Sequence, residues 1–287
     1  METGLRSTEN RTGDRLLVKL SIVLSTHTAA FQAVAFKGDF SANVAKIAGW
    51  GYDGVELAIR DPSLVNAGDL EGVIAEHGLE VPAIGTGQAW GEEGLSFTSD
   101  DPEIRDAAIE RIVSHIPLAE RLNAIVILGL IRGVTPEGQT HDQSMAYLVH
   151  AIRRCAAAAE GTSVRFALEP MNRYETDLVH SAAEGLELVK KVGADKFGLL
   201  LDTFHMNIEE PDICASIRGC GDRIFHFHVA DSNRWHPGAG HLDFGIILEE
   251  LGATGYQGFV SGEFMPRPDA DTAAERGITY LRNVIAS

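Results

Sequence analysis

The sequence is poor in cysteine and has no long hydrophobic run. Its 287 residues include three cysteines, Cys155, Cys214 and Cys220, an odd number with no CxxC pattern. Reduced thiols in a cytoplasmic protein are the simplest interpretation of so few cysteines. No stretch of about 18 apolar residues is present, so no transmembrane helix is expected. We therefore expect a cytoplasmic protein with no membrane partner.

Basic residues are also scarce. Lys and Arg together number 24 against 41 Asp and Glu, which gives a formal net charge of −17. Such an acidic surface repels phosphate backbones and anionic lipids. Nucleic-acid binding is therefore not expected as the main activity.

The beginning of the chain lacks the features of a secretory signal. Its first residues, METGLRSTENRTGDR, are polar and contain no apolar core segment. We expect a disordered N-terminal extension over residues 1–15. Because no linker or low-complexity tract divides the remainder, residues 16–287 are predicted to form one catalytic domain.

Short strand-like runs alternate with helix-like segments through this domain. The runs span residues 16–24, 54–59, 80–86, 124–131, 164–170, 197–202, 224–231 and 258–264. Eight such repeats in about 270 residues match the number and size of a (β/α)8 TIM barrel. A doubly wound sheet is the competing fold, but the first run is followed by STHTAAFQAVAFKGDF rather than by a glycine-rich phosphate loop. The prediction is an α/β protein with a single (β/α)8 TIM barrel.

Carboxylate and imidazole side chains occur at the ends of four consecutive predicted strands. Active sites of TIM barrels form at the C-terminal ends of the strands, so these side chains should converge. Carboxylates gathered in this way raise one another's pKa unless a cation neutralises them. One imidazole with three carboxylates suits Mn²⁺, Mg²⁺ or Co²⁺ better than structural zinc. The predicted metal ligands are Glu169, Asp202, His228 and Glu263.

The predicted seventh strand carries two histidines. His226 and His228 are two residues apart, so their side chains share one face of the strand. We interpret His228 as the ligand and His226 as a supporting or packing residue. Any one histidine here is more often a hydrogen-bonded core residue, and Glu169 or Glu263 alone could pair with an arginine. The metal hypothesis depends on four ligand-type residues at four consecutive strand ends.

Longer motifs resemble a known family. LEPMNRYETD, LLLDTFHMNIEE, FHFHVADSNRWHPGAGHLDF and SGEF are similar to the sugar isomerase/epimerase superfamily with its xylose-isomerase-like barrel. The D-tagatose/D-psicose 3-epimerase family is the best-known match, and spacings of 33, 26 and 35 residues between the four predicted ligands fit its metal quartet. AFKGDF, AIGTGQAWGEEGLSFT and GLIRG resemble most closely the 5-keto-L-gluconate epimerase branch.

The resemblance implies an activity and roles for particular residues. The quartet would hold one divalent metal, typically Mn²⁺, and Glu169 and Glu263 would also serve as the catalytic acid/base pair. The substrate would be a ketose or keto-sugar acid of the 5-keto-L-gluconate or D-tagaturonate type, epimerised by removal and return of the C3 proton through an enediolate. Glu175, His205 and Arg234 occupy positions that contact substrate oxygens. A homodimer or homotetramer is implied as well.

The far end of the substrate site stays open at this stage. Trp90 is predicted to form a pocket wall. An acid sugar needs a cation there, and arginine offers a bidentate match to carboxylate. Arg132 is included among the predicted substrate contacts, with Arg60, Arg173 and Arg234 as further candidates, although Arg60 and Arg132 could instead pair with nearby acids. Whether His27 lines the pocket is also open.

Other functions use the same barrel. An aldose–ketose isomerase of the hydroxypyruvate or keto-inositol type would move the proton between C1 and C2. A C-glycoside-cleaving lyase would expel a leaving group and work with a small partner subunit. A DNA-repair endonuclease would need more histidine ligands and a basic groove, and an inactive sugar-binding barrel would not need all four ligands.

Overall fold

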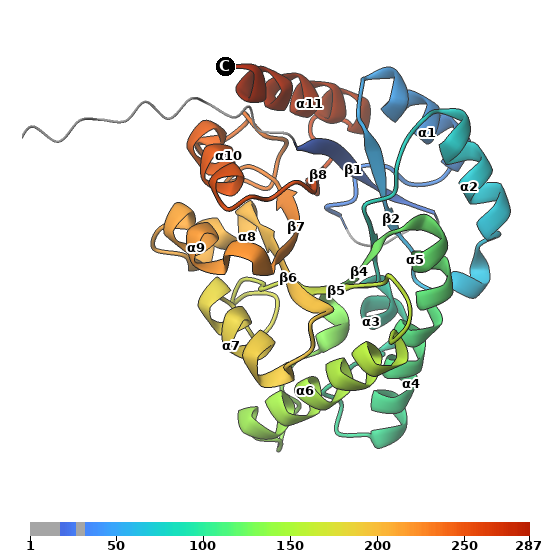
Figure 1. The fold of residues 1–287 in the computed structure, drawn as a ribbon, viewed down its shortest axis with the longest axis vertical. Coiled ribbons are helices and arrows are strands. Elements are labelled where there is room, and N and C mark those ends of the chain that lie inside the picture. Colours follow the sequence, from blue (N-terminus) through green and yellow to red (C-terminus); the bar gives the residue numbers. More distant parts are fainter. Residues whose placement is uncertain (1–17, 27–31) are drawn as a thin grey trace, which may run out of the picture.

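The barrel is closed by eight parallel strands that follow one another in sequence order (Figure 1). The computed structural model describes residues 18–26 and 32–287, so the predicted extension at 1–15 and His27 lie outside the described residues. The arrangement confirms the predicted single TIM barrel. The strands are β1 (Lys19–Ser25), β2 (Gly54–Ala58), β3 (Ala83–Gly85), β4 (Ile125–Leu128), β5 (Phe166–Leu168), β6 (Phe197–Asp202), β7 (Ile224–Val229) and β8 (Phe259–Gly262).

The strands are buried on both faces. Every residue of β2, β4, β5 and β6 is buried. Helices cover the outside of a parallel barrel and side chains fill its inside, which is why its strands appear in the sequence as continuous apolar runs. The last strand closes the barrel by pairing with the first, with Phe259 opposite Lys19.

Helices surround the strands on the outside of the barrel (Figure 1). None of those in the described part of the chain has the length and hydropathy of a membrane span. The α-helices are α1 (Phe40–Gly49), α2 (Ala67–Glu76), α3 (Gln88–Glu93), α4 (Pro102–Ser114), α5 (Ile116–Leu122), α6 (His141–Ala158), α7 (Ala182–Val192), α8 (Thr203–Glu209), α9 (Ile213–Cys220), α10 (Phe244–Ala253) and α11 (Ala270–Ala286), with short 3₁₀ turns at η1 (Pro62–Leu64), η2 (Leu130–Arg132) and η3 (Gly221–Arg223).

The helix-like stretch after residue 100 begins as the sequence indicates but divides in two. The Asp101 side chain caps α4 by accepting a hydrogen bond from the Glu103 backbone N–H at 2.8 Å, and Pro102 occupies the first turn. The helix ends at Ser114, and α5 begins at Ile116 with Pro117 in its first turn. Because proline has no N–H to donate to a preceding carbonyl, it is tolerated at the start of a helix and not in its interior.

Candidate active site

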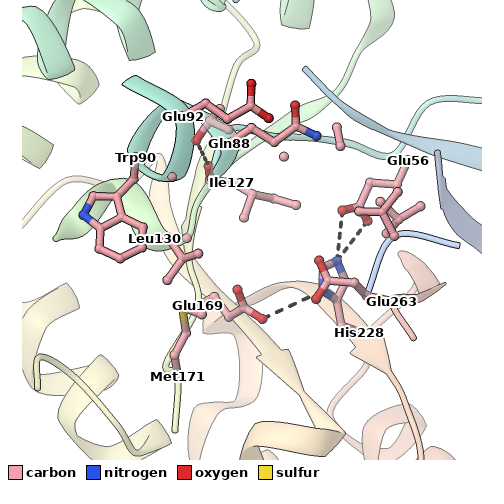
Figure 2. A pocket seen from close by; sticks show the side chains of 18 of the residues that line it. Glu56, Gln88, Trp90, Glu92, Ile127, Leu130, Glu169, Met171, His228 and Glu263 are labelled. Carbon is pink, nitrogen blue, oxygen red and sulfur yellow. Dashed lines mark hydrogen bonds and ion pairs between the residues drawn. The ribbon is translucent and has the colours of Figure 1, made fainter. Parts of the chain in front are cut away.

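A cavity of about 320 Å³ opens where the strands end. Figure 2 shows Gln88, Trp90 and Glu92 of α3 on one side of it and His228 with Glu263 on the other. Apolar side chains, including Val23, Val34, Ile127, Leu130 and Met171, form much of the remaining wall.

Three of the four predicted metal ligands, Glu169, His228 and Glu263, line this cavity, and Asp202 lies against them. The Nδ1 atom of His228 lies 3.7 Å from Asp202 Oδ2 and 3.9 Å from both Glu169 Oε1 and Glu263 Oε2. Each of the four residues offers one ligand atom, and these atoms all lie within 4.8 Å of one another. Separations of this size leave room for one divalent ion with bonds of about 2.1 Å.

Three of these atoms are buried without a hydrogen-bond partner in the described protein: Glu169 Oε1, Asp202 Oδ2 and His228 Nδ1. Leaving a buried polar atom unpaired is costly, so three at one point require an explanation. A cation placed among them would bond to all three. The donor set, three carboxylates and one imidazole, fits a cation of the Mn²⁺ or Mg²⁺ class. The structure therefore contains a buried metal-binding site.

Local structure directs Asp202 toward this point. The residue ends β6 and also caps α8, since its Oδ1 accepts a hydrogen bond from the Phe204 backbone N–H at 2.6 Å. The other oxygen, Oδ2, is left to face His228. A buried strand ends in a carboxylate here because that carboxylate both starts the next helix and faces the metal site.

Burial and mutual repulsion raise the pKa of the clustered carboxyl groups. Burial, with the Glu263 charge second, raises the pKa of Glu169 well above its usual value. Burial likewise raises the pKa of Glu263 to about 7 and also raises that of Asp202. Without a cation these groups therefore hold protons at higher pH than isolated carboxyls do, and a bound cation reverses that preference.

One residue in this region, Glu56 of β2, was missed by the sequence interpretation. Its Oε2 accepts hydrogen bonds from Nε2 of His226 at 2.7 Å and from Nε2 of His228 at 3.0 Å. Although burial alone raises the pKa of Glu56, the two histidines hold it well below the usual range. The signal was a single charged residue inside the apolar run GVELAI, where an unpaired carboxylate is costly.

His205 lies beside the metal site. Its Nδ1 accepts hydrogen bonds from the backbone N–H of Asn172 at 3.3 Å and from the Asn172 side-chain amide at 2.7 Å. Its Nε2 therefore carries the proton in the neutral ring and points toward Glu169 Oε1, 3.6 Å away. Burial and the nearby Arg234 charge lower the pKa of His205 well below its usual value, so the ring is neutral.

Glu175 and Arg234 form an ion pair at the edge of the site. Arg234 Nη1 donates to Glu175 Oε1 at 2.8 Å, and Nη2 lies 3.7 Å from Glu263 Oε2. The Arg234 guanidinium also stacks over the ring of Phe204, 4.7 Å from its centre. The pair thus connects a predicted substrate contact to one of the predicted metal ligands.

Arg132 requires a correction to the predicted substrate contacts. Its side chain is fully buried and is absent from the cavity wall. The guanidinium donates instead to backbone carbonyls, namely those of Gly129, Glu169, Leu178 and Val179. The 3₁₀ turn η2 that follows β4 places the residue among carbonyls, so position just beyond a strand end did not predict where the side chain goes.

The other arginine candidates are engaged in ion pairs with acidic side chains. Arg60 pairs with Glu92 and Glu93 of α3. Arg173 pairs with Glu209 at 2.7 Å. Trp90 lies on the cavity wall, where the sequence interpretation placed it.

Comparison with known proteins gives consistent matches. A family model described as a xylose isomerase-like TIM barrel matches residues 44–284. An L-ribulose 3-epimerase from Mesorhizobium japonicum is 30% identical over 266 residues, covering 92% of this chain and 88% of that protein. A D-psicose 3-epimerase from Ruminiclostridium cellulolyticum is 32% identical over 238 residues, 80% of each chain. The crystal structure of a D-psicose 3-epimerase from Clostridium cellulolyticum H10 with D-tagatose superposes with a TM-score of 0.81 at 25% identity, covering 93% of this chain and 99% of that one.

Proposed function

Because the chain belongs to the xylose isomerase-like TIM-barrel family and, within it, to the ketose 3-epimerases, we propose that it inverts C3 of a ketose at the cavity described above. Its class as an isomerase follows from that membership. The observation that carries the proposal is the convergence of two carboxylates, the buried Glu169 and the half-buried Glu263, on the metal site.

We assign the two glutamates as the acid/base pair. They follow β5 and β8, which are separated by β6 and β7 in the barrel, so they approach a bound sugar from different sides. One removes the C3 proton, and the other returns a proton to the opposite face, which inverts the carbon. Metal ligation would keep both carboxylates ionised near neutral pH, which the residue that removes the proton requires.

The proposed cofactor is Mn²⁺, with Mg²⁺ and Co²⁺ as alternatives. A divalent cation held by the quartet would act as a Lewis acid toward negative charge that develops on the substrate oxygens at C2 and C3. The unpaired Asp202 Oδ2 and His228 Nδ1 support its presence.

The neighbouring polar groups are proposed to orient the substrate. The Nε2–H of His205 is a buried donor 3.6 Å from Glu169 and has no partner in the described protein, so it can donate to a substrate oxygen. Arg234 and Glu175 provide a donor and an acceptor held together at 2.8 Å. Trp90 would pack against the carbon chain of the sugar.

Two substrate classes fit this chemistry. Of the described residues that line the cavity, Arg234 is the one lysine or arginine, and it pairs with Glu175. Glu92 adds negative charge to the wall. These charges favour a neutral ketose, the kind of sugar in the names of the two epimerases compared above. The motif resemblance to 5-keto-L-gluconate epimerase supports the second class, a keto-sugar acid such as 5-keto-L-gluconate or D-tagaturonate.

Location and assembly remain proposals as well. All three cysteines are free thiols, and Cys155 and Cys220 are buried, which supports a cytoplasmic location. A homodimer or homotetramer is proposed on the motif resemblance.

The proposal is tested by hydrogen exchange at carbon. The Mn²⁺-loaded protein is incubated in D₂O with D-fructose, D-psicose, L-ribulose, 5-keto-L-gluconate and D-tagaturonate, and the products are analysed by NMR. Deuterium at the hydroxyl-bearing carbon next to the ketone, with the carbonyl still at its original carbon, is the expected result; this carbon is C3 of the ketoses and of D-tagaturonate and is numbered C4 in 5-keto-L-gluconate. Formation of an aldose would instead assign an aldose–ketose isomerase, and release of an aglycone from a C-glycoside would assign a lyase. The Glu263→Gln variant is the matched control, and its exchange should be slower by about 10²–10⁴.

A further inference from the structure

We propose that Glu56 is a positioning residue that fixes the ring orientation and the tautomer of the metal ligand His228. His226 in turn holds the Glu56 carboxylate. The proposal rests on the metal site and is independent of which sugar the protein converts.

The first observation is the geometry around the His228 ring. Its Nε2 lies 3.0 Å from both oxygens of Glu56, while its Nδ1, on the other side of the ring, faces the other three ligands. A carboxylate can only accept hydrogen bonds, so Nε2 must carry a proton. In the neutral ring the lone pair then belongs to Nδ1, the atom that faces the metal site. Figure 2 shows Glu56 and Glu169 on opposite sides of His228.

The second observation is that Glu56 is itself held. Its Oε2 accepts from Nε2 of His226 at 2.7 Å, the shortest of its contacts with the two rings. The two imidazoles meet edge to face, 5.2 Å apart. His226 is 1% exposed, as are Glu56 and His228. The three side chains therefore form one buried hydrogen-bonded group, in which His226 fixes the Glu56 carboxylate and the carboxylate fixes the ring of His228.

Strand packing alone does not require this unit. Glu56 comes from β2 and the histidines from β7, and these strands are not neighbours in the barrel. The contact thus crosses the barrel interior, where an apolar side chain would pack at lower desolvation cost. Partners that orient a ligating histidine generally alter metal affinity by 10- to 100-fold when removed.

The test is metal affinity measured without reference to catalysis. Apoprotein is titrated with Mn²⁺ by calorimetry for the wild type, Glu56→Gln and His226→Gln. Glu56→Gln keeps an acceptor but loses the charge and one acceptor oxygen, and its Kd for Mn²⁺ is expected to rise about 10- to 100-fold. His226→Gln is expected to raise Kd less, because the contact between Glu56 and His228 remains. The matched control is Glu80→Gln, an exposed carboxylate paired with Lys19, and its Kd should not change.

Activity at different Mn²⁺ concentrations is the second measurement. If Glu56 had a purely structural role, added Mn²⁺ would not restore the activity of the variant. The C3 exchange lost by Glu56→Gln at one equivalent of Mn²⁺ should return at a large excess, since the defect lies in holding the ion. A wild-type Kd for Glu56→Gln would overturn the proposal. So would activity that stays lost at saturating Mn²⁺. If the wild type binds Mn²⁺ but exchanges no C3 proton, the proposed function fails and the positioning role is still tested by Kd.

A third measurement needs no variant, so it holds even if Glu56→Gln does not fold. In wild-type protein loaded with diamagnetic Mg²⁺, the ¹⁵N spectrum of His228 should show a protonated Nε2 and an unprotonated Nδ1. The opposite tautomer would overturn the proposal.

Discussion

The two halves of the barrel form opposite walls of one cavity, and they differ in how far their polar groups are paired. The half from β5 to β8 supplies Glu169, Asp202 and His228, each with a buried atom that has no hydrogen-bond partner in the described protein. The half from β1 to β4 supplies Glu56, which accepts from two histidines, and Glu92, which pairs with Arg60. Groups that are unpaired in the protein are available to an ion or a substrate, whereas paired groups shape the cavity around them.

Replacing a carboxylate of the metal cluster, in the half from β5 to β8, should have the largest effect. Glu263→Gln removes a proposed proton donor and acceptor together with a charged metal ligand, so kcat should fall by about 10²–10⁴ and Mn²⁺ affinity should also fall. Steady-state kinetics and calorimetry measure the two effects. Glu92→Gln changes a residue of the same cavity in the half from β1 to β4, where Glu92 pairs with Arg60, and this variant should keep most of the turnover. Equal losses in both variants would remove the distinction between the halves.

Removing Arg132 should lower stability rather than substrate affinity. Arg132→Met leaves buried backbone carbonyls without their donor, which should reduce the free energy of unfolding by roughly 2–4 kcal/mol. Urea denaturation gives that change, and KM for the best ketose should stay near the wild-type value. A raised KM with unchanged stability would return Arg132 to the substrate contacts predicted from the sequence.

Protonation of the clustered carboxyl groups should make the stability of the metal-free protein depend on pH. Burial raises the pKa values of Glu169 and Glu263, the latter to about 7. Although burial alone lowers the pKa of His228, the Glu56 charge outweighs burial and raises that pKa to about 10. The folded apoprotein therefore retains protons that the unfolded chain has released. Its stability should therefore fall as pH rises from about 6.5 to 8, by at most about 1.4 kcal/mol per proton and pH unit. The lowered pKa values of His205 and His226 have the opposite effect, because they make stability rise with pH below about 6.5. The predicted fall in stability therefore begins near that pH.

Thermal melts with and without EDTA measure this slope. Excess Mn²⁺ should remove it, because the bound ion keeps the carboxylates ionised. Glu263→Gln should reduce it in the apoprotein. A flat profile in wild-type apoprotein would mean that neither these carboxyls nor His228 retains extra protons without metal.

The smallest effect is expected at the far wall. Glu92→Gln removes one negative charge and frees Arg60 from one of its ion pairs, a partly exposed interaction of a kind worth less than about 1 kcal/mol. The ratio of kcat/KM for 5-keto-L-gluconate to that for D-psicose should rise severalfold at most. A fall in that ratio would show that Glu92 does not select against carboxylate.

The sequence predicted those parts of the molecule that depend on local pattern. The run 197–202 became β6 with the same limits, because a buried strand must be apolar throughout and Asp202 then caps the following helix. The sequence grouped the four predicted metal ligands, which the structure brings together, because the fold places every strand end at one opening.

Interactions that cross the barrel were harder to predict. The partners of Glu56 are 170 and 172 residues away in the sequence. Nothing local reports them except the presence of a charge in an apolar run. Arg132 shows the same limit, since a 3₁₀ turn directs its side chain toward carbonyls contributed by distant loops. The position of a residue along a strand predicts where its backbone lies, whereas tertiary contacts determine which partners its side chain reaches.

The pairing of β8 with β1 has a further consequence for folding. Glu263 comes directly after β8, and the register of Phe259 with Lys19 closes the ring. A chain that had formed every strand but the last would lack one of the four ligands. Metal uptake can therefore report when the ring is complete. Since the ion binds the closed form better than any open one, its concentration should shift the equilibrium toward the closed ring by mass action.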